Sequence, residues 1–93
     1  MNIEQLEIYC ETQSHTIDHA QKAKVYQNMG TFLHQEHPSK ERMLTELAER
    51  AIRAQQTVEF LQQASATQAM IDPYQALEDV CGELFELLLT SPR

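Results

Sequence analysis

The sequence predicts an all-α protein, and three observations lead to that prediction. The 93 residues include only two glycines, three prolines and no tryptophan, beside abundant Gln, Ala, Leu and Glu. Apolar residues recur three and four positions apart along most of the chain, which is the helical period. Signals that end one helix and begin the next surround Pro38 and Pro73. We therefore expect a single domain, residues 1–93, with helices at about 3–36, 40–70 and 73–90.

The first predicted helix, 3–36, has a long apolar stripe with one interruption. Six polar residues, ETQSHT at 11–16, separate its two apolar stretches. A helix of more than 30 residues is long for a globular domain. Either the helix breaks at 11–16 or it carries a polar layer there, and both alternatives stay open. The apolar positions are Ile3, Leu6, Cys10, Ile17, Ala20, Val25, Tyr26, Met29, Phe32 and Leu33.

The second predicted helix, 40–70, follows a turn at Pro38. A proline disfavours the α conformation of the residue before it, so the first helix should end by His37. Ser39 is a good N-cap for the next helix, with Glu41 near its positive end. The seam of this helix is Leu44, Leu47, Ala51, Ala54, Val58 and Leu61. Two helices of similar length joined by a tight turn predict a long antiparallel hairpin.

The third predicted helix, 73–90, begins at the clearest local signal in the chain. Asp72 suits the N-cap, Pro73 the first helical position, and Gln75 the capping-box position. This helix would be roughly 25 Å long and cover half of a hairpin about 50 Å long. Its register should place Cys81 near Cys10. We interpret both cysteines as small buried core residues, with a disulfide or redox pair as the alternative.

More apolar surface is predicted than these three helices can bury against one another. The closed end of the hairpin would lie beyond the third helix, and the third helix carries a second apolar row beside its core stripe. Such surfaces indicate self-association into a bundle, or docking of a partner. The predicted contact residues are Val25, Met29, Phe32 and Met43 at the hairpin end, and Leu84, Phe85, Leu88 and Leu89 on the third helix.

The segment HTIDH presents the best candidate for a metal site. His15 and His19 are four residues apart, as two zinc ligands on one helix would be, and Glu11 could be a third ligand. However, Ile17 marks the core face, and each histidine lies about 200° around the helix from it. We therefore interpret the pair as solvated histidines, and predict neither a metal nor another cofactor.

Composition and charge exclude several classes of function. The net charge is −7 and the seven basic residues are scattered, which disfavours binding to nucleic acid or to anionic membranes. The pairs Glu46/Arg50 and Glu49/Arg53 have the i, i+4 spacing of solvated ion pairs. The first residues resemble no signal peptide and no apolar run could cross a membrane, so a cytoplasmic protein is expected.

The sequence thus predicts a non-enzymatic protein–protein interaction module. It would be a small acidic adaptor, chaperone or regulator, present as a homodimer or bound to another helical protein. No phosphate-binding loop, nucleophile pair or small-molecule substrate site is evident, so no catalytic residue is predicted. The alternatives are a metal-binding helical protein that uses His15 and His19, and a purely structural oligomer subunit.

Overall fold

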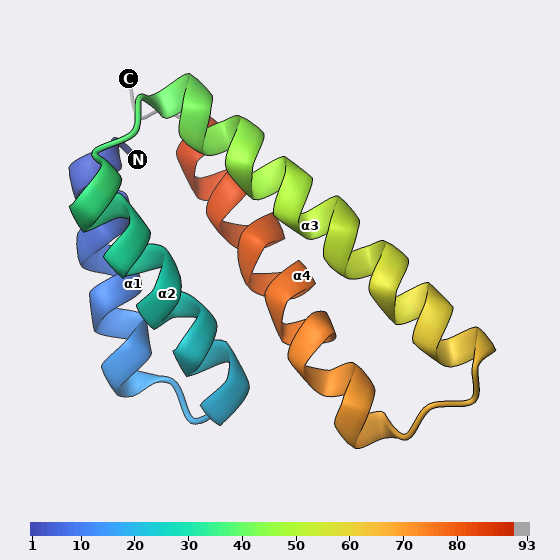
Figure 1. Cartoon of the computed structure of the whole chain (residues 1–93). Helices are drawn as coiled ribbons and strands as arrows, with labels where there is room; N and C mark the ends of the chain where they lie inside the picture. The colour runs from blue at the N-terminus through green and yellow to red at the C-terminus, as the bar shows by residue number, and fades with distance from the viewer. Residues whose placement is uncertain (91–93) are drawn as a thin grey trace.

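The computed structural model describes residues 1–90 and contains four helices and no strand in that range (Figure 1). They are α1 (Ile3–Thr16), α2 (Ala20–Glu36), α3 (Lys40–Gln63) and α4 (Gln68–Leu89). The all-α prediction is confirmed. Helix α1 packs along α2 and α3 packs along α4, and the two pairs meet mainly where α2 lies against α4. Among the described residues, no helix is both long and apolar enough to cross a membrane.

The range 3–36 is divided into two helices, so of the two alternatives left open the break is correct and the single helix is wrong. The segment ETQSHT is itself helical, and α1 ends at its last residue, Thr16. The hydroxyls of Ser14 and Thr16 donate to backbone carbonyls three and four residues earlier, at 2.6 and 2.9 Å, a pattern that weakens a helix from within. His19 then caps α2, because its Nδ1 accepts a hydrogen bond from the backbone N–H of Lys22 at 3.2 Å.

This break replaces the predicted long hairpin by two shorter helix pairs. The chain folds back after α1, so α2 packs on α1, and α3 packs chiefly on α4. The apolar surface that was expected to need a partner is largely buried within the chain itself. All four helices contribute to the core of the protein, which consists of Leu6, Cys10, Val25, Tyr26, Met29, Leu33, Met43, Leu47, Ala76, Val80, Cys81, Leu84 and Leu88.

The corner between α2 and α3 follows the sequence signals. His37 ends α2 in the left-handed conformation, with φ of 45°, and its N–H donates to the Leu33 carbonyl at 3.1 Å. Pro38 is buried, and the Ser39 hydroxyl accepts a hydrogen bond from the Arg42 N–H at 3.1 Å. The predicted Ser39 cap is therefore confirmed.

The corner between α3 and α4 lies earlier in the chain than predicted. Helix α3 ends at Gln63, and α4 begins at Gln68, a full turn before the expected cap at Asp72. Asp72 instead accepts a hydrogen bond from the Gln68 side chain at 2.6 Å. The additional turn also buries Ile71. Tertiary packing and this side-chain bond therefore extend the helix past its strongest local start signal.

Replacing Pro73 by alanine is expected to stabilise the fold. Pro73 lies inside α4, where it lacks the N–H that would donate to the carbonyl four residues earlier, a defect that costs about 3 kcal/mol in a helix interior. Replacing proline also increases the conformational entropy of the unfolded chain, which offsets about 1 kcal/mol of the gain. We expect the free energy of unfolding to rise by roughly 2 kcal/mol in urea titrations followed by circular dichroism. An unchanged or lower value would place the true start of α4 at Pro73.

Candidate functional site

Most of the predicted interface residues are buried in the core of the protein. Five of the eight are buried in the core, namely Val25, Met29, Met43, Leu84 and Leu88. Phe32 and Phe85 are half-buried, and the guanidinium groups of Arg42 and Arg50 lie 5.7 and 5.3 Å from the Phe32 ring centroid. Leu89 alone is well exposed, at 53 %. In this conformation the predicted residues therefore do not form one continuous surface.

The structure separates the two histidines of HTIDH. His15 lies in the last turn of α1, whereas His19 is the N-cap of α2, so the helical i, i+4 geometry does not apply to them. Within residues 1–90, no group of three or more His, Cys, Asp or Glu side chains is arranged to hold a metal ion. Glu11, the third candidate ligand, remains on the exposed face of α1.

The fold-back at residues 17–19 creates a groove between α1 and α2 instead. This groove has a volume of about 550 Å³, and His15 and His34 both line it together with Glu7 and Glu11. His34 Nδ1 lies 3.3 Å from Glu7 Oε2. A straight helix would have kept the two histidines more than 25 Å apart at the usual helical rise of about 1.5 Å. The groove is thus a consequence of the helix break and could not be read from helical spacing.

A tyrosine pair connects three of the helices. The Tyr26 hydroxyl on α2 donates a short hydrogen bond to Glu83 on α4, and Tyr9 on α1 packs edge-on against Tyr26, with ring centroids 6.1 Å apart. Burial, and then the hydrogen bond to Glu83, raise the pKa of Tyr26. Tyr26 therefore remains a protonated donor in the neutral range, and its role is to join α2 to α4.

The two cysteines are free thiols in the core. Cys10 and Cys81 are both fully buried. Burial, followed by the charge of Glu83, raises the pKa of Cys10 to about 12; burial also raises the pKa of Cys81 to about 11, against a smaller lowering by Arg50. Because the thiolate is the reactive form, neither sulfur is an activated nucleophile near neutral pH. The interpretation of both as small core residues is confirmed.

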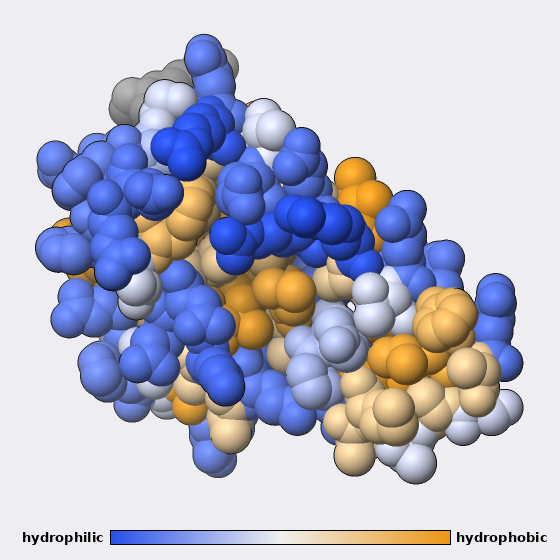
Figure 2. Space-filling view, viewed as in Figure 1, coloured by the Kyte–Doolittle hydropathy of each residue, from blue (hydrophilic) through white to orange (hydrophobic). Residues whose placement is uncertain are grey.

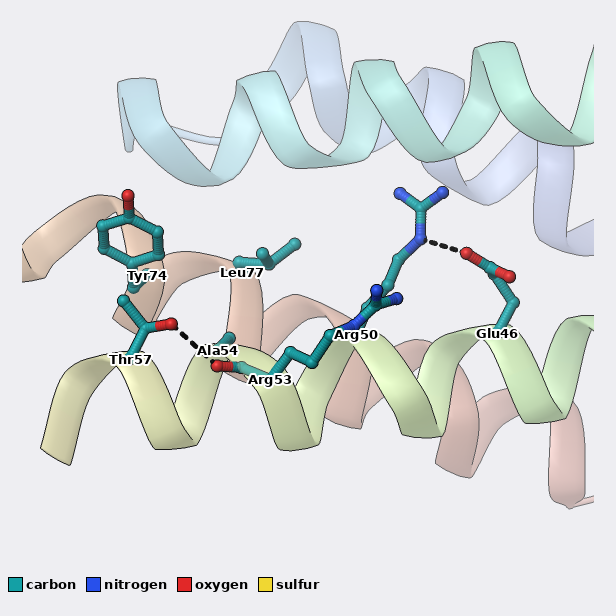
Figure 3. A pocket seen from close by; sticks show the side chains of 7 residues that line it. All are labelled: Glu46, Arg50, Arg53, Ala54, Thr57, Tyr74 and Leu77. Atoms are coloured by element: carbon teal, nitrogen blue, oxygen red, sulfur yellow. Dashed lines mark hydrogen bonds and ion pairs between the residues drawn. The ribbon is translucent and has the colours of Figure 1, made fainter. Parts of the chain in front are cut away.

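A groove of about 460 Å³ lies between α3 and α4, and we call it the arginine groove. Its lining residues are Glu46, Arg50, Arg53, Ala54, Thr57, Tyr74 and Leu77 (Figure 3). Ala54 is buried and Leu77 half-buried, so the groove has an apolar floor. Its volume falls within the range of small-ligand sites, about 300–1,000 Å³.

The cationic side chains of this groove are not equally neutralised. Arg50 Nε donates to Glu46 Oε1 at 2.7 Å, which confirms the first of the two predicted ion pairs. Arg53 Nε donates weakly, at 3.4 Å, to the backbone carbonyl of Glu49 and not to its carboxylate. Figure 3 shows the Arg53 side chain running along α3 toward Arg50. The groove therefore holds two guanidinium groups against one carboxylate.

An uncharged apolar surface covers the end of the α3/α4 pair. Residues 60–71, FLQQASATQAMI, include no Asp, Glu, Lys, Arg or His, and hydrophobic side chains gather over this end of the molecule (Figure 2). Phe60 is 69 % exposed and Met70 is 56 % exposed. We name this surface the apolar tip and define it by Phe60, Leu61, Ala64, Ala69 and Met70.

Sequence reasoning passed over both surfaces, although each left a signal. Phe60 lies about 200° around the helix from Val58, a core position, so it cannot face the same side. The absence of charge over 60–71 is directly visible in a chain that is 23 % charged. Arg50 and Arg53 are three residues apart, which places both on one face of α3. The groove itself required the position of α4, which the expected long hairpin had misplaced.

Comparison of the chain with protein-family models, with curated proteins and with solved structures finds no match.

Proposed function

We propose that this protein is a non-enzymatic interaction module that self-associates through the apolar tip. The observation that supports this most is the combination of exposure and neutrality there. Phe60 and Met70 are large, apolar and more than half exposed, and an apolar surface rimmed by polar residues is typical of protein–protein contacts. The tip lies at the end of a helix pair that reaches away from α1 and α2 (Figure 1).

The charge distribution favours a second copy of this chain as the occupant. Each copy carries a net charge of −7, so two copies repel each other across most of their surfaces. The segment 60–71 carries no charged side chain and therefore adds nothing to this repulsion, although Glu59 and Asp72 flank it. A tip-to-tip contact also directs the acidic bodies away from each other along a molecule 44 Å long. That length exceeds the Debye length of about 8 Å at physiological ionic strength several-fold.

A two-fold contact between tips would close after two copies. In such an arrangement the same patch serves both subunits, which leaves no free tip for a third copy. Such a closed dimer differs from an open assembly, whose mass would continue to grow with concentration. We further propose a cytoplasmic location, because Cys10 and Cys81 are unpaired thiols, as is usual in a reducing compartment.

The mass in solution across a dilution series tests this proposal. The contact is small, so we expect the measured mass to fall from near twice 10.7 kDa to 10.7 kDa on dilution through roughly the micromolar range. The variant Phe60→Asp places a charge in the tip and should stay at 10.7 kDa throughout.

The matched control is Ile52→Asp. Ile52 is another apolar residue of α3, is 54 % exposed and lies outside the tip, so its replacement introduces the same charge elsewhere. It should dimerise like the unmodified protein, and all three proteins should have equal helix content by circular dichroism. A monomer at every concentration, or a Phe60→Asp variant that still dimerises, would overturn the proposal. So would a mass that keeps growing beyond the dimer.

A further inference from the structure

The arginine groove carries an inference that is independent of the apolar tip. Arg50 and Arg53 are three residues apart on α3 and both line the groove. Like charges at this spacing destabilise a helix, and Glu46 offsets only Arg50. Two positive charges and one negative charge thus remain together in a chain whose total is −7. A second anion in the groove would remove the remaining repulsion.

The free hydrogen-bonding groups of the groove are mostly donors. Arg50 Nε donates to Glu46, and Arg53 Nε donates to the Glu49 backbone carbonyl. The Nη groups of both arginines therefore remain as donors for a ligand. The Thr57 hydroxyl donates to the Arg53 carbonyl at 2.9 Å and is already occupied as a donor. Tyr74 lines the same groove and is 40 % exposed. Guanidinium forks match the two oxygens of a carboxylate, with which they form paired hydrogen bonds.

The groove also holds one guanidinium in place before any ligand binds. Arg50 is fixed by its 2.7 Å bond to Glu46 and by its position over the Phe32 ring, 5.3 Å from the centroid. A preorganised side chain loses less conformational entropy on binding. Beside it, Leu77 and the buried Ala54 provide an apolar floor. The site therefore offers cationic donors on one wall and apolar contact below.

We propose that the arginine groove binds a carboxylate carried on a small apolar body, with Arg50 and Arg53 holding the carboxylate and Leu77 and Ala54 contacting the body. The carboxylate could belong to a free organic acid or to an acidic side chain of a polypeptide. Both sources share the same recognition chemistry. This assignment adds a ligand site that sequence patterns did not predict.

Titrations followed by amide chemical shifts test the proposal with four probes. The first is 4-phenylbutyrate, a free acid with an apolar body, and the second is its neutral amide. The third is the capped tripeptide acetyl-Leu-Glu-Leu-amide, which carries the carboxylate on a polypeptide. The fourth is inorganic phosphate, an anion without an apolar body. We expect 4-phenylbutyrate or the tripeptide to bind with a Kd of about a millimolar, and the amide and phosphate at least tenfold more weakly.

Arg53→Gln is the diagnostic variant, because Arg53 is exposed and its loss leaves the core intact. It should weaken binding by roughly tenfold or more, the usual effect of losing a hydrogen bond to a charged group. Arg42→Gln removes an exposed arginine of the same helix that does not line the groove, and should change Kd by less than twofold. Binding by the tripeptide alone would support the proposal and identify a protein as the source of the carboxylate.

Four results would overturn the proposal. The amide or phosphate could bind as tightly as the better of the two carboxylate probes, or Arg53→Gln could leave the Kd of that probe unchanged. The fourth result is failure of all four probes to bind. None of these results bears on dimerisation through Phe60, because the tip and the groove are tested by different variants and different measurements.

Discussion

Replacing Leu84 by alanine is expected to lower the free energy of unfolding by about 2–5 kcal/mol, the usual cost of truncating a fully buried leucine. Leu84 is 0 % exposed and belongs to the central core cluster on α4. The alanine leaves a cavity, because the surrounding helices relax only in part. A domain of this size has a total stability of about 5–15 kcal/mol. The loss should therefore appear as a large shift of the urea midpoint at an unchanged m-value.

Leu89→Ala is the matched control, on the same helix and with the same chemical change. Leu89 is 53 % exposed, so its truncation should alter the free energy of unfolding by no more than about 0.5 kcal/mol. The comparison also tests the sequence-based expectation that both leucines form one docking surface. Equal and small effects at the two positions would mean that Leu84 is not enclosed by the chain, and the packing of α4 described above would be wrong.

Local chemistry predicted the helices of this protein better than it predicted their pairing. Ser39 caps α3 as predicted, because its hydroxyl lies directly before the first helical residue, and the preceding helix ends before Pro38. These signals act over three or four residues and need no knowledge of the rest of the fold. The break after Thr16 is different, because helical side-chain patterns on both sides of it permit a continuous helix. The packing of Val25, Met29 and Leu33 into a shared core stabilises the folded-back arrangement in addition to the local bonds of Thr16 and His19.

The break after Thr16 changed which apolar residues are exposed. With a straight helix over 3–36, Val25, Met29 and Met43 would have lain beyond the reach of the third helix, and they were predicted as contacts. With α2 folded back onto α1, these side chains are buried. Large apolar side chains are exposed instead at Phe60 and Met70 of the apolar tip, and singly at Ile8, Ile52 and Leu89. The arginine groove could not be predicted at all, because it requires Tyr74 and Leu77 of α4 to lie beside α3. A surface depends on helix pairing, and tertiary packing can also override a local cap signal, as it does at Asp72.

The stability of the protein is expected to fall steeply on the alkaline side. Burial raises the pKa of Cys10 from 9.0 to about 12 and that of Cys81 from 9.0 to about 11. Each thiol therefore loses its proton more readily in the unfolded chain than in the folded one. The stabilisation is complete below pH 9 and is lost as the pH rises toward the folded values. Each thiol lowers the free energy of unfolding by about 1.4 kcal/mol per pH unit in that window.

Urea titrations at pH 8 and pH 10, with a reductant present, measure this effect. We expect the free energy of unfolding to be about 3 kcal/mol lower at pH 10, since both thiols ionise in the unfolded chain over this range. The double variant with Cys10→Ala and Cys81→Ala removes both groups and should lose most of the pH dependence, whatever its stability at pH 8. The pKa values of Tyr9 and Tyr26 are also raised from 10.0. Both are about half ionised in the unfolded chain at pH 10, so they add a smaller decrease, which the double variant retains. Equal slopes in the two proteins would show that the thiols ionise as easily in the folded chain, and hence that Cys10 and Cys81 are reached by water.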